Sequence, residues 1–140
     1  SYTTSPTGAD HMNSNLPTRS AKNVVGMCFF LRYDDVKMAE ILHAVTGWEV
    51  TDKEVLEIGE RGLALARLYN EREGLGAESD VLPPQVTKPH VSGVLSKVRL
   101  DPDELRAQVR AYYAARGWSE DGHPLPATLE RLGIAEYARA

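Results

Sequence analysis

The most regular hydrophobic pattern in the chain lies between Thr51 and Gly74, where apolar and small residues recur at steps of three and four. Such spacing places them on one face of an α-helix with about 3.6 residues per turn. Thr51 is a good N-cap, and Glu54 can return its hydrogen bond in a capping box. We therefore predict a long amphipathic helix over about 51–73, around which the rest of the chain packs. The stripe that it should bury comprises Val55, Ile58, Gly59, Gly62, Leu65, Ala66 and Tyr69, widened by Leu56, Leu63 and Leu68.

Two glycines inside this helix predict a close contact. A glycine in a helix interior costs about 1 kcal/mol relative to alanine. Gly59 and Gly62, together with Ala66, therefore indicate a flat strip that another segment approaches closely. Core packing is one interpretation of this face, and a role in lining a cofactor is the other.

Caps and helix breakers predict the remaining elements. Helices that begin at an acidic residue or proline and end at glycine are expected over 35–46, 102–116 and 126–132. The apolar run 24–31 could be a buried strand or a turn of buried helix, and Gly26 favours a turn. The segment 75–93 is rich in proline, which predicts an ordered connector that follows the surface.

The first residues differ in character from the rest. Residues 1–12, SYTTSPTGADHM, are polar and have no periodicity, so we predict a disordered leader. The closing pair His11 and Met12 resembles the junction that a cloning site leaves, which indicates a vector-derived segment. Residues 13–140 are predicted to form a single domain. Its fold class should be all-α, an irregular multi-helix domain with four or five helices and no convincing strand.

Composition narrows the function classes. A chain of 140 residues with 42% hydrophobic content is long enough for one core and too short for two ordinary domains. The net charge of −4 without a basic block argues against nucleic acid and anionic membranes as partners. No apolar run approaches the roughly 20 residues of a membrane-spanning helix, and no signal-peptide pattern opens the sequence. We therefore expect a cytoplasmic protein.

Taken alone, the residues point to no catalytic chemistry. No nucleophile with a paired base, phosphate-binding glycine loop or cluster of metal ligands stands out. His43 and His90 have no second ligand nearby in sequence. Cys28 is the single cysteine, so it cannot hold zinc or an iron–sulfur cluster by itself. From spacing alone it is interpreted as a buried small hydrophobic residue, as free cysteines commonly are.

Four separated sequence blocks nevertheless share one resemblance. They are NVVGMC at 23–28, HAVTGWEVTDKEVLEIGERGLALARLYNEREG at 43–74, DVLPPQ at 80–85 and YYAARGWSEDGHPLPATLERLGI at 112–134. In this order and spacing they resemble the C-terminal region of the aldehyde ferredoxin oxidoreductase family of tungsten or molybdenum enzymes. The resemblance covers nearly everything outside the leader.

The resemblance implies cofactors and site residues. Members of the family carry a bis-pterin (molybdopterin-type) tungsten or molybdenum cofactor and a 4Fe-4S cluster. Three closely spaced upstream cysteines and one cysteine of a D-x-x-G-x-C motif bind that cluster. Cys28 matches this fourth cysteine and Gly26 the motif glycine, whereas Asn23 replaces the aspartate expected to contact a pterin. Asn23, Gly26 and Met27 are therefore the expected cofactor-binding residues, and Cys28 is the expected metal ligand.

Two functions follow as hypotheses. The first is the C-terminal helical domain of such an enzyme, whose other domains are its partners and whose parent passes electrons from aldehyde oxidation to ferredoxin. The alternative is a non-catalytic helical interaction module that retains the scaffold without cofactor, which the missing aspartate favours. In either case the isolated chain should bind no cluster or pterin and should be inactive. It should also expose Cys28 within an apolar face and tend to self-associate through that face.

Overall fold

The structure, a computed structural model, describes residues 3–8 and 16–139. Five α-helices follow one another as α1 (Pro17–Val24), α2 (Asp35–Thr46), α3 (Asp52–Arg72), α4 (Pro102–Arg116) and α5 (Pro126–Arg131). Three short 3-10 helices, η1 (Ala77–Ser79), η2 (Val94–Lys97) and η3 (Ala135–Arg139), complete the regular structure. The described residues contain no β-strand, and the predicted all-α class is confirmed.

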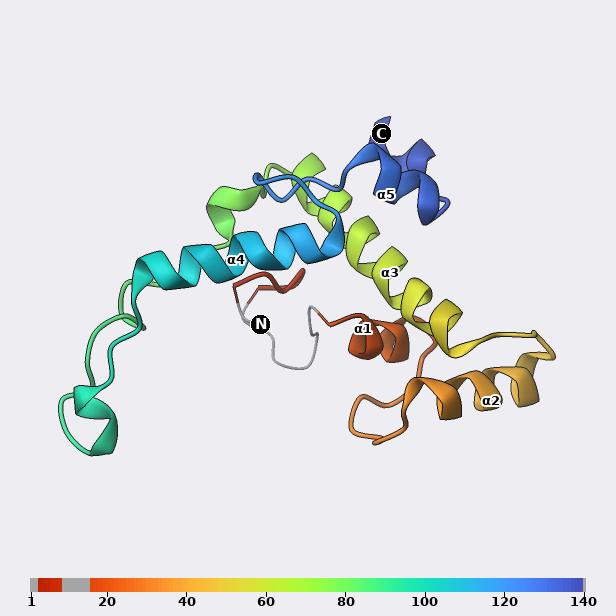
Figure 1. Ribbon diagram of the computed structural model, residues 1–140, viewed down its shortest axis with the longest axis horizontal. Helices are drawn as coiled ribbons and strands as arrows, with labels where there is room; N and C mark the ends of the chain where they lie inside the picture. The colour runs from red at the N-terminus through yellow and green to blue at the C-terminus, as the bar shows by residue number, and fades with distance from the viewer. Residues whose placement is uncertain (1–2, 9–15, 140) are drawn as a thin grey trace.

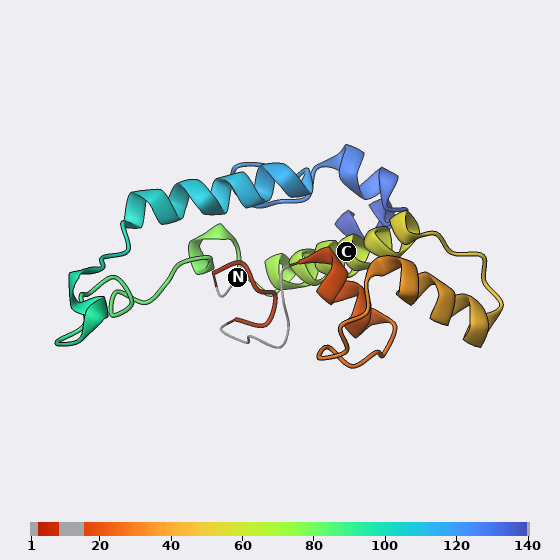
Figure 2. The same cartoon turned by 60° about the horizontal axis from the view of Figure 1, so that its bottom comes forward.

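Helix α3 is the central element of the molecule. Figure 2 shows α1 and α2 on one side of it and α4 and α5 on the other. It begins with the predicted capping box: the Thr51 hydroxyl accepts from the Glu54 amide at 3.3 Å, and the Glu54 carboxylate accepts from the Thr51 amide at 2.8 Å. Two of the backbone amides left without a partner at this end of the helix are thereby satisfied.

Two separate hydrophobic clusters pack against α3, one towards each end. The first, on the side of α1 and α2, comprises Ala21, Met38, Ala39, Leu42 and Val55. The second, on the side of α5, comprises Ala64, Leu68, Leu129, Leu132 and Ile134. Because neighbours cover α3 on two sides, its buried surface is wider than the single stripe that the sequence predicts.

The predicted stripe is wrong at Tyr69 and omits two buried residues of α3. Tyr69 is 57% exposed, Leu63 and Leu68 are buried as predicted, and the buried residues also include Ala64 and Arg67, which the prediction left out. The reason lies in the length of α1, which ends at Val24, beside Gly62. Beyond that point, no α-helix among the described residues covers Tyr69, and the short η3 reaches it only with Tyr137, which lines a pocket beside it. The ring of Tyr69 lies instead under the Arg72 guanidinium, 5.0 Å from its carbon.

The close contact at the two glycines is confirmed, and the approaching segment is α1. A Cβ at Gly59 would overlap the backbone carbonyl of Pro17, and one at Gly62 would lie 2.7 Å from a methyl group of Val24. The sequence did not predict α1, because its residues PTRSAKNV have almost no apolar face. It is the flat glycine strip of α3 that accommodates this polar helix.

The prediction of a connector that follows the surface is wrong for residues 81–100, here called the arm. Figures 1 and 2 show the arm extending well away from the helices beyond one end of α4. Val91 and Val94 are almost completely exposed. The turns of the arm are closed by local bonds, such as Val86 N–H to the Pro83 carbonyl at 2.9 Å.

The structure describes residues 3–8 of the predicted leader and leaves residues 1, 2 and 9–12 outside the described part. Gly8 N–H donates to the Ser5 carbonyl at 3.2 Å, which closes a turn. The Asn70 side chain of α3 donates to the Pro6 carbonyl at 2.9 Å. Residues 3–8 are thus placed against α3, while a disordered and vector-derived leader over residues 1–12 stays a prediction.

Candidate functional site

The candidate site is the segment that joins α1 to α2, residues 25–34, here called the Cys28 loop. It begins with a tight reversal in which Gly26 has φ +72°. A Cβ at Gly26 would meet nothing within 4 Å, so the left-handed backbone conformation, not lack of space, requires glycine there. The amide of Gly26 donates to the Asn23 carbonyl at 3.2 Å, and that of Met27 to the Lys22 carbonyl at 2.8 Å.

The side chain of Cys28 is exposed and its thiol is free. This contradicts the interpretation of Cys28 as a buried small residue, made from spacing alone, and agrees with the exposed position expected from the resemblance. The residues on either side anchor the loop: Met27 is half-buried against the first hydrophobic cluster, and the Arg19 guanidinium lies 4.6 Å from the ring centre of Phe29. Cys28 therefore lies at the surface, while its neighbours Met27 and Phe29 attach the loop to the rest of the domain.

Lys22 provides an anchor that sequence reasoning missed. Its side chain is only 6% exposed, and its ammonium group donates to the Leu31 carbonyl at 2.7 Å. The bond joins the last turn of α1 to the far side of the Cys28 loop. Burial, and to a lesser extent the neighbouring Asp34, raises the pKa of Asp35, while the charge of Lys22 opposes that rise. No usable signal for this role exists in the sequence, because the burial of Lys22 follows from the packing of α1, a helix that the sequence did not predict.

The four predicted site residues lie together but differ in what they present. Asn23, Gly26 and Cys28 are exposed around the same turn. The side chain of Met27 packs inward against the first cluster, so a contact from Met27 to a cofactor would come from its backbone. His43 and His90, which lacked partners in sequence, lie outside this turn.

The donor set of the described residues suits one ligand of a shared metal centre and not a complete site. In residues 3–8 and 16–139, no three side chains of the His, Cys, Asp or Glu types gather closely enough to hold a metal ion. A four-iron cluster usually takes four thiolates. The single exposed thiol of Cys28 fits the supply of one of them, provided that the other ligands come from another part of a longer protein.

The same turn lies within a family match that covers most of the chain. Residues 17–134 match the model of the family described as aldehyde ferredoxin oxidoreductase, domains 2 and 3. The chain belongs to this family. The match includes α1, the Cys28 loop and every later α-helix.

Curated relatives agree with this assignment. The tungsten-containing aldehyde ferredoxin oxidoreductase of Pyrococcus furiosus is 35% identical over 117 residues, covering 80% of this chain and 19% of the relative. The protein of the same name from Thermococcus kodakarensis is 32% identical over 120 residues, covering 82% of this chain and 19% of the relative. The WOR-like subunit of an aliphatic sulfonate oxidoreductase of Pyrococcus furiosus is 30% identical over 158 residues, 99% of this chain and 25% of that subunit.

The chain spans about a fifth of the length of the aldehyde ferredoxin oxidoreductases that it matches. In the part of the chain that the structure describes, no helix is both long enough and apolar enough to cross a membrane.

Proposed function

We propose that this chain is the C-terminal helical domain of an aldehyde ferredoxin oxidoreductase-type enzyme, here called the parent, and that Cys28 supplies one thiolate to its 4Fe-4S cluster. The observation that supports this most directly is the exposed thiol of Cys28 on an anchored loop, at the cysteine of the family-like motif. A ligand to a cluster held mainly by another domain must lie at the surface of its own domain.

Each residue of the turn has a part in this proposal. Gly26 reverses the chain so that Cys28 follows directly after the end of α1. The Lys22 bond to Leu31 and the packing of Met27 hold the loop, so that the thiolate keeps one position when the cluster is bound. Asn23, exposed at the end of α1, offers a neutral amide towards a tungsten or molybdenum bis-pterin cofactor. The neutral side-chain amide of asparagine lacks the negative charge of the motif aspartate, but it can still donate and accept hydrogen bonds there.

When bound, the cluster supplies one-electron transfer and the metal–pterin group supplies the oxidation of an aldehyde to a carboxylate, with ferredoxin as electron acceptor. This domain contributes ligation, position and burial rather than the redox chemistry itself. Its partners are the remaining domains of the parent. Without them, the apolar face around the Cys28 loop, where Phe30 is 69% exposed, should promote self-association.

The test is made in the parent, produced from the coding sequence together with its upstream domains. Cys28→Ser should remove the cluster or change the electron paramagnetic resonance signal of its reduced form, because a serine oxygen replaces a sulfur ligand. Val45→Ser, an exposed change on α2 outside the Cys28 loop, should leave that signal unaltered. An unaltered signal and iron content in Cys28→Ser would contradict the assignment of Cys28.

The second candidate is a non-catalytic helical interaction module. Asn23 in place of the motif aspartate is the observation that favours it. A native gene product that lacks the three upstream cysteines and contains neither iron nor tungsten would support this alternative over the first.

A further inference from the structure

Two positively charged side chains are buried in the described part of the chain, Lys22 of α1 and Arg67 of α3, which are 6% and 7% exposed. Both residue types carry a positive charge at neutral pH. A buried charge is costly unless a group of opposite charge compensates it. The two cations meet this requirement in different ways.

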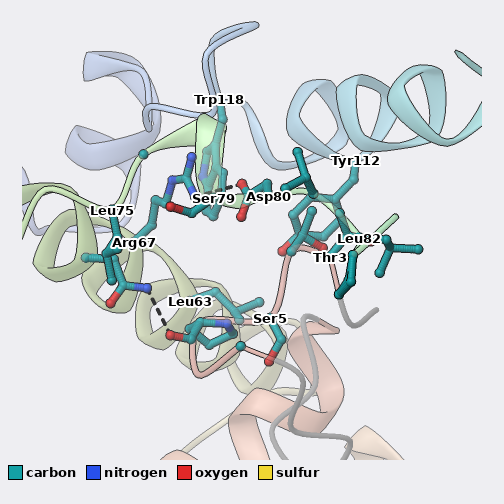
Figure 3. Close-up of a pocket in the computed structure, with 17 residues that line it drawn as sticks. Thr3, Ser5, Leu63, Arg67, Leu75, Ser79, Asp80, Leu82, Tyr112 and Trp118 are labelled. Carbon is teal, nitrogen blue, oxygen red and sulfur yellow. Dashed lines mark hydrogen bonds and ion pairs between the residues drawn. The ribbon is translucent and has the colours of Figure 1, made fainter. Parts of the chain in front are cut away.

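Arg67 is compensated within the domain. Its guanidinium forms ion pairs with Asp80 at 2.8 Å and with Glu71 at 3.3 Å. Figure 3 shows the Arg67 side chain directed towards Asp80, near Trp118. A further bond runs from Arg67 to the Gly122 carbonyl at 3.0 Å. This buried cation therefore needs no anion from outside the domain.

Lys22 has no such partner. Among the described residues, no carboxylate forms an ion pair with its ammonium group, which donates to the neutral carbonyl of Leu31 at 2.7 Å. The charge of Lys22 does act on Asp35, but burial and then the charge of Asp34 raise the pKa of Asp35, and Lys22 offsets only part of that rise. Burial thus disfavours the charged form of the one carboxyl that could serve as a counter-ion. The positive charge of Lys22 is left largely uncompensated by this domain.

Hydrogen bonds place this charge within the Cys28 loop. The Met27 amide donates to the Lys22 carbonyl at 2.8 Å, directly before the cysteine. The Leu31 amide donates to the Cys28 carbonyl at 3.1 Å, and the Leu31 carbonyl accepts the bond from the Lys22 ammonium. Lys22 is therefore connected to the chain on both sides of Cys28. An anion that binds at Cys28 would lie on the loop that encloses the uncompensated cation.

A thiolate-ligated iron–sulfur cluster is such an anion. The net charge of the cluster and the groups around it set its reduction potential. The cluster becomes more negative when it accepts an electron, so a fixed positive charge nearby stabilises the reduced form more than the oxidised form. Because water is largely excluded from Lys22, its charge is screened less than the charge of an exposed lysine.

We propose that Lys22 is the buried counter-charge of the 4Fe-4S cluster of the parent and that it raises the reduction potential of this cluster. The role rests on the proposed function, since it requires Cys28 to bind the cluster. It goes beyond anchoring of the loop: the bond to Leu31 positions the ammonium group, and the charge acts on the cluster. A lysine that only anchored the loop could be replaced by a neutral hydrogen-bond donor without any change in potential.

The test is a redox titration of the parent with its cluster, followed by the electron paramagnetic resonance signal of the reduced form. Lys22→Gln keeps a donor for the Leu31 carbonyl but removes the charge. It should lower the equilibrium constant for reduction of the cluster about tenfold, which corresponds to about 59 mV for one electron. Lys22→Arg keeps the charge and should retain the wild-type potential. Lys37→Gln removes an exposed charge that is paired with Glu40 on α2 and should retain it as well.

The variants separate the effect of charge from that of geometry. If Lys22→Gln prevents assembly of the cluster, iron content replaces the titration, and Lys22→Arg should then still contain the iron of the cluster. An unchanged potential in Lys22→Gln would overturn the proposal. So would an equal loss of potential or iron in Lys22→Arg, or an equal fall in potential in Lys37→Gln.

Cys28→Ser distinguishes failure of this role from failure of the proposed function. An unaltered signal in Cys28→Ser would refute the proposed function. An altered signal in Cys28→Ser, together with an unchanged potential in Lys22→Gln, would refute the role of Lys22 alone.

Discussion

The Cys28 loop and the arm are both exposed, apolar and free of α-helix, yet they are attached to the molecule in different ways. In the Cys28 loop, Lys22 bonds the Leu31 carbonyl and Met27 packs into the first hydrophobic cluster. In the arm, the bonds that close the turns are local, as from Ser96 N–H to the Gly93 carbonyl. The first segment is fixed to α1, whereas the second extends away from the helices.

This difference bears on how each segment would meet a partner. An anchored loop holds its exposed groups in one position beforehand, which reduces the entropy lost on binding. A segment with few contacts to its own domain must be ordered by whatever it binds, and it opens at low free-energy cost. We therefore expect the Cys28 loop to present a preformed contact and the arm to acquire its final conformation from the rest of the parent.

The largest difference between the two regions should appear on truncation of an apolar side chain. Met38 is fully buried in the first hydrophobic cluster, against which Met27 of the Cys28 loop packs. Met38→Ala should therefore lower the free energy of unfolding by about 2–5 kcal/mol. Leu95 is half exposed in the arm, and Leu95→Ala should change it by less than about 0.5 kcal/mol. Urea denaturation measures both values. Equal losses would show that the arm is part of the cooperative core.

A methyl group at Gly59 should separate α1 from α3 and loosen the Cys28 loop with it. The added Cβ meets the Pro17 backbone, which cannot move aside without shifting α1. We expect Gly59→Ala to cost about 1–3 kcal/mol. Gly62→Ala should cost less, because its Cβ meets the end of the Val24 side chain, which can rotate. If Gly59→Ala is as stable as the wild type in urea, the close helix contact does not exist.

Removal of the Lys22 bond should have a smaller, local effect. Lys22→Met retains the apolar length of the side chain but loses the bond to Leu31, worth about 1 kcal/mol. Hydrogen exchange at Leu31 should then accelerate about fivefold. Lys37→Met serves as control, because Lys37 is exposed and pairs with Glu40 on α2. Unchanged exchange at Leu31 in Lys22→Met would mean that Lys22 does not anchor the loop.

The smallest change should distinguish the regions by protease access without altering stability. Trypsin can cut after Lys97 and Arg99 in the arm and after Arg32 in the Cys28 loop, and all three residues are exposed. Because the arm is the less anchored segment, cleavage there should come first, as mass spectrometry of the early fragments would reveal. In Lys97→Gln/Arg99→Gln the first cut should move to Arg32. Initial cleavage at Arg32 in the wild type would reverse the comparison.

The features that the sequence predicted correctly depend on local chemistry. The capping box of Thr51 and Glu54 and the all-α class need only propensity, period and caps. Helix α1 was missed because it is stabilised by contact with Gly59 and Gly62 rather than by an apolar stripe of its own. The exposure of Tyr69 depends on where α1 ends against α3, which is a feature of the tertiary structure and is not encoded in the local pattern.

The candidate site divides in the same way. The cysteine and glycine of the turn could be found from the motif, since Gly26 is required by a local positive φ. Lys22 and Arg67 could not, because each gains its role from partners distant in sequence, as with the bond from Arg67 to Gly122. Prolines in the arm correctly excluded an α-helix there, but nothing local determines whether a connector follows its own surface or leaves it.

The alkylation rate of Cys28 tests the central claim, that its thiol lies at the surface of this domain in order to bind a cluster held elsewhere. The rate with iodoacetamide is compared in the native isolated chain, in the parent with its cluster and in the parent after the cluster has been removed. We predict rapid alkylation in the isolated chain, protection in the loaded parent and renewed alkylation once iron is removed. Slow alkylation of the native isolated chain as a monomer, or unprotected Cys28 in the loaded parent, would contradict the account.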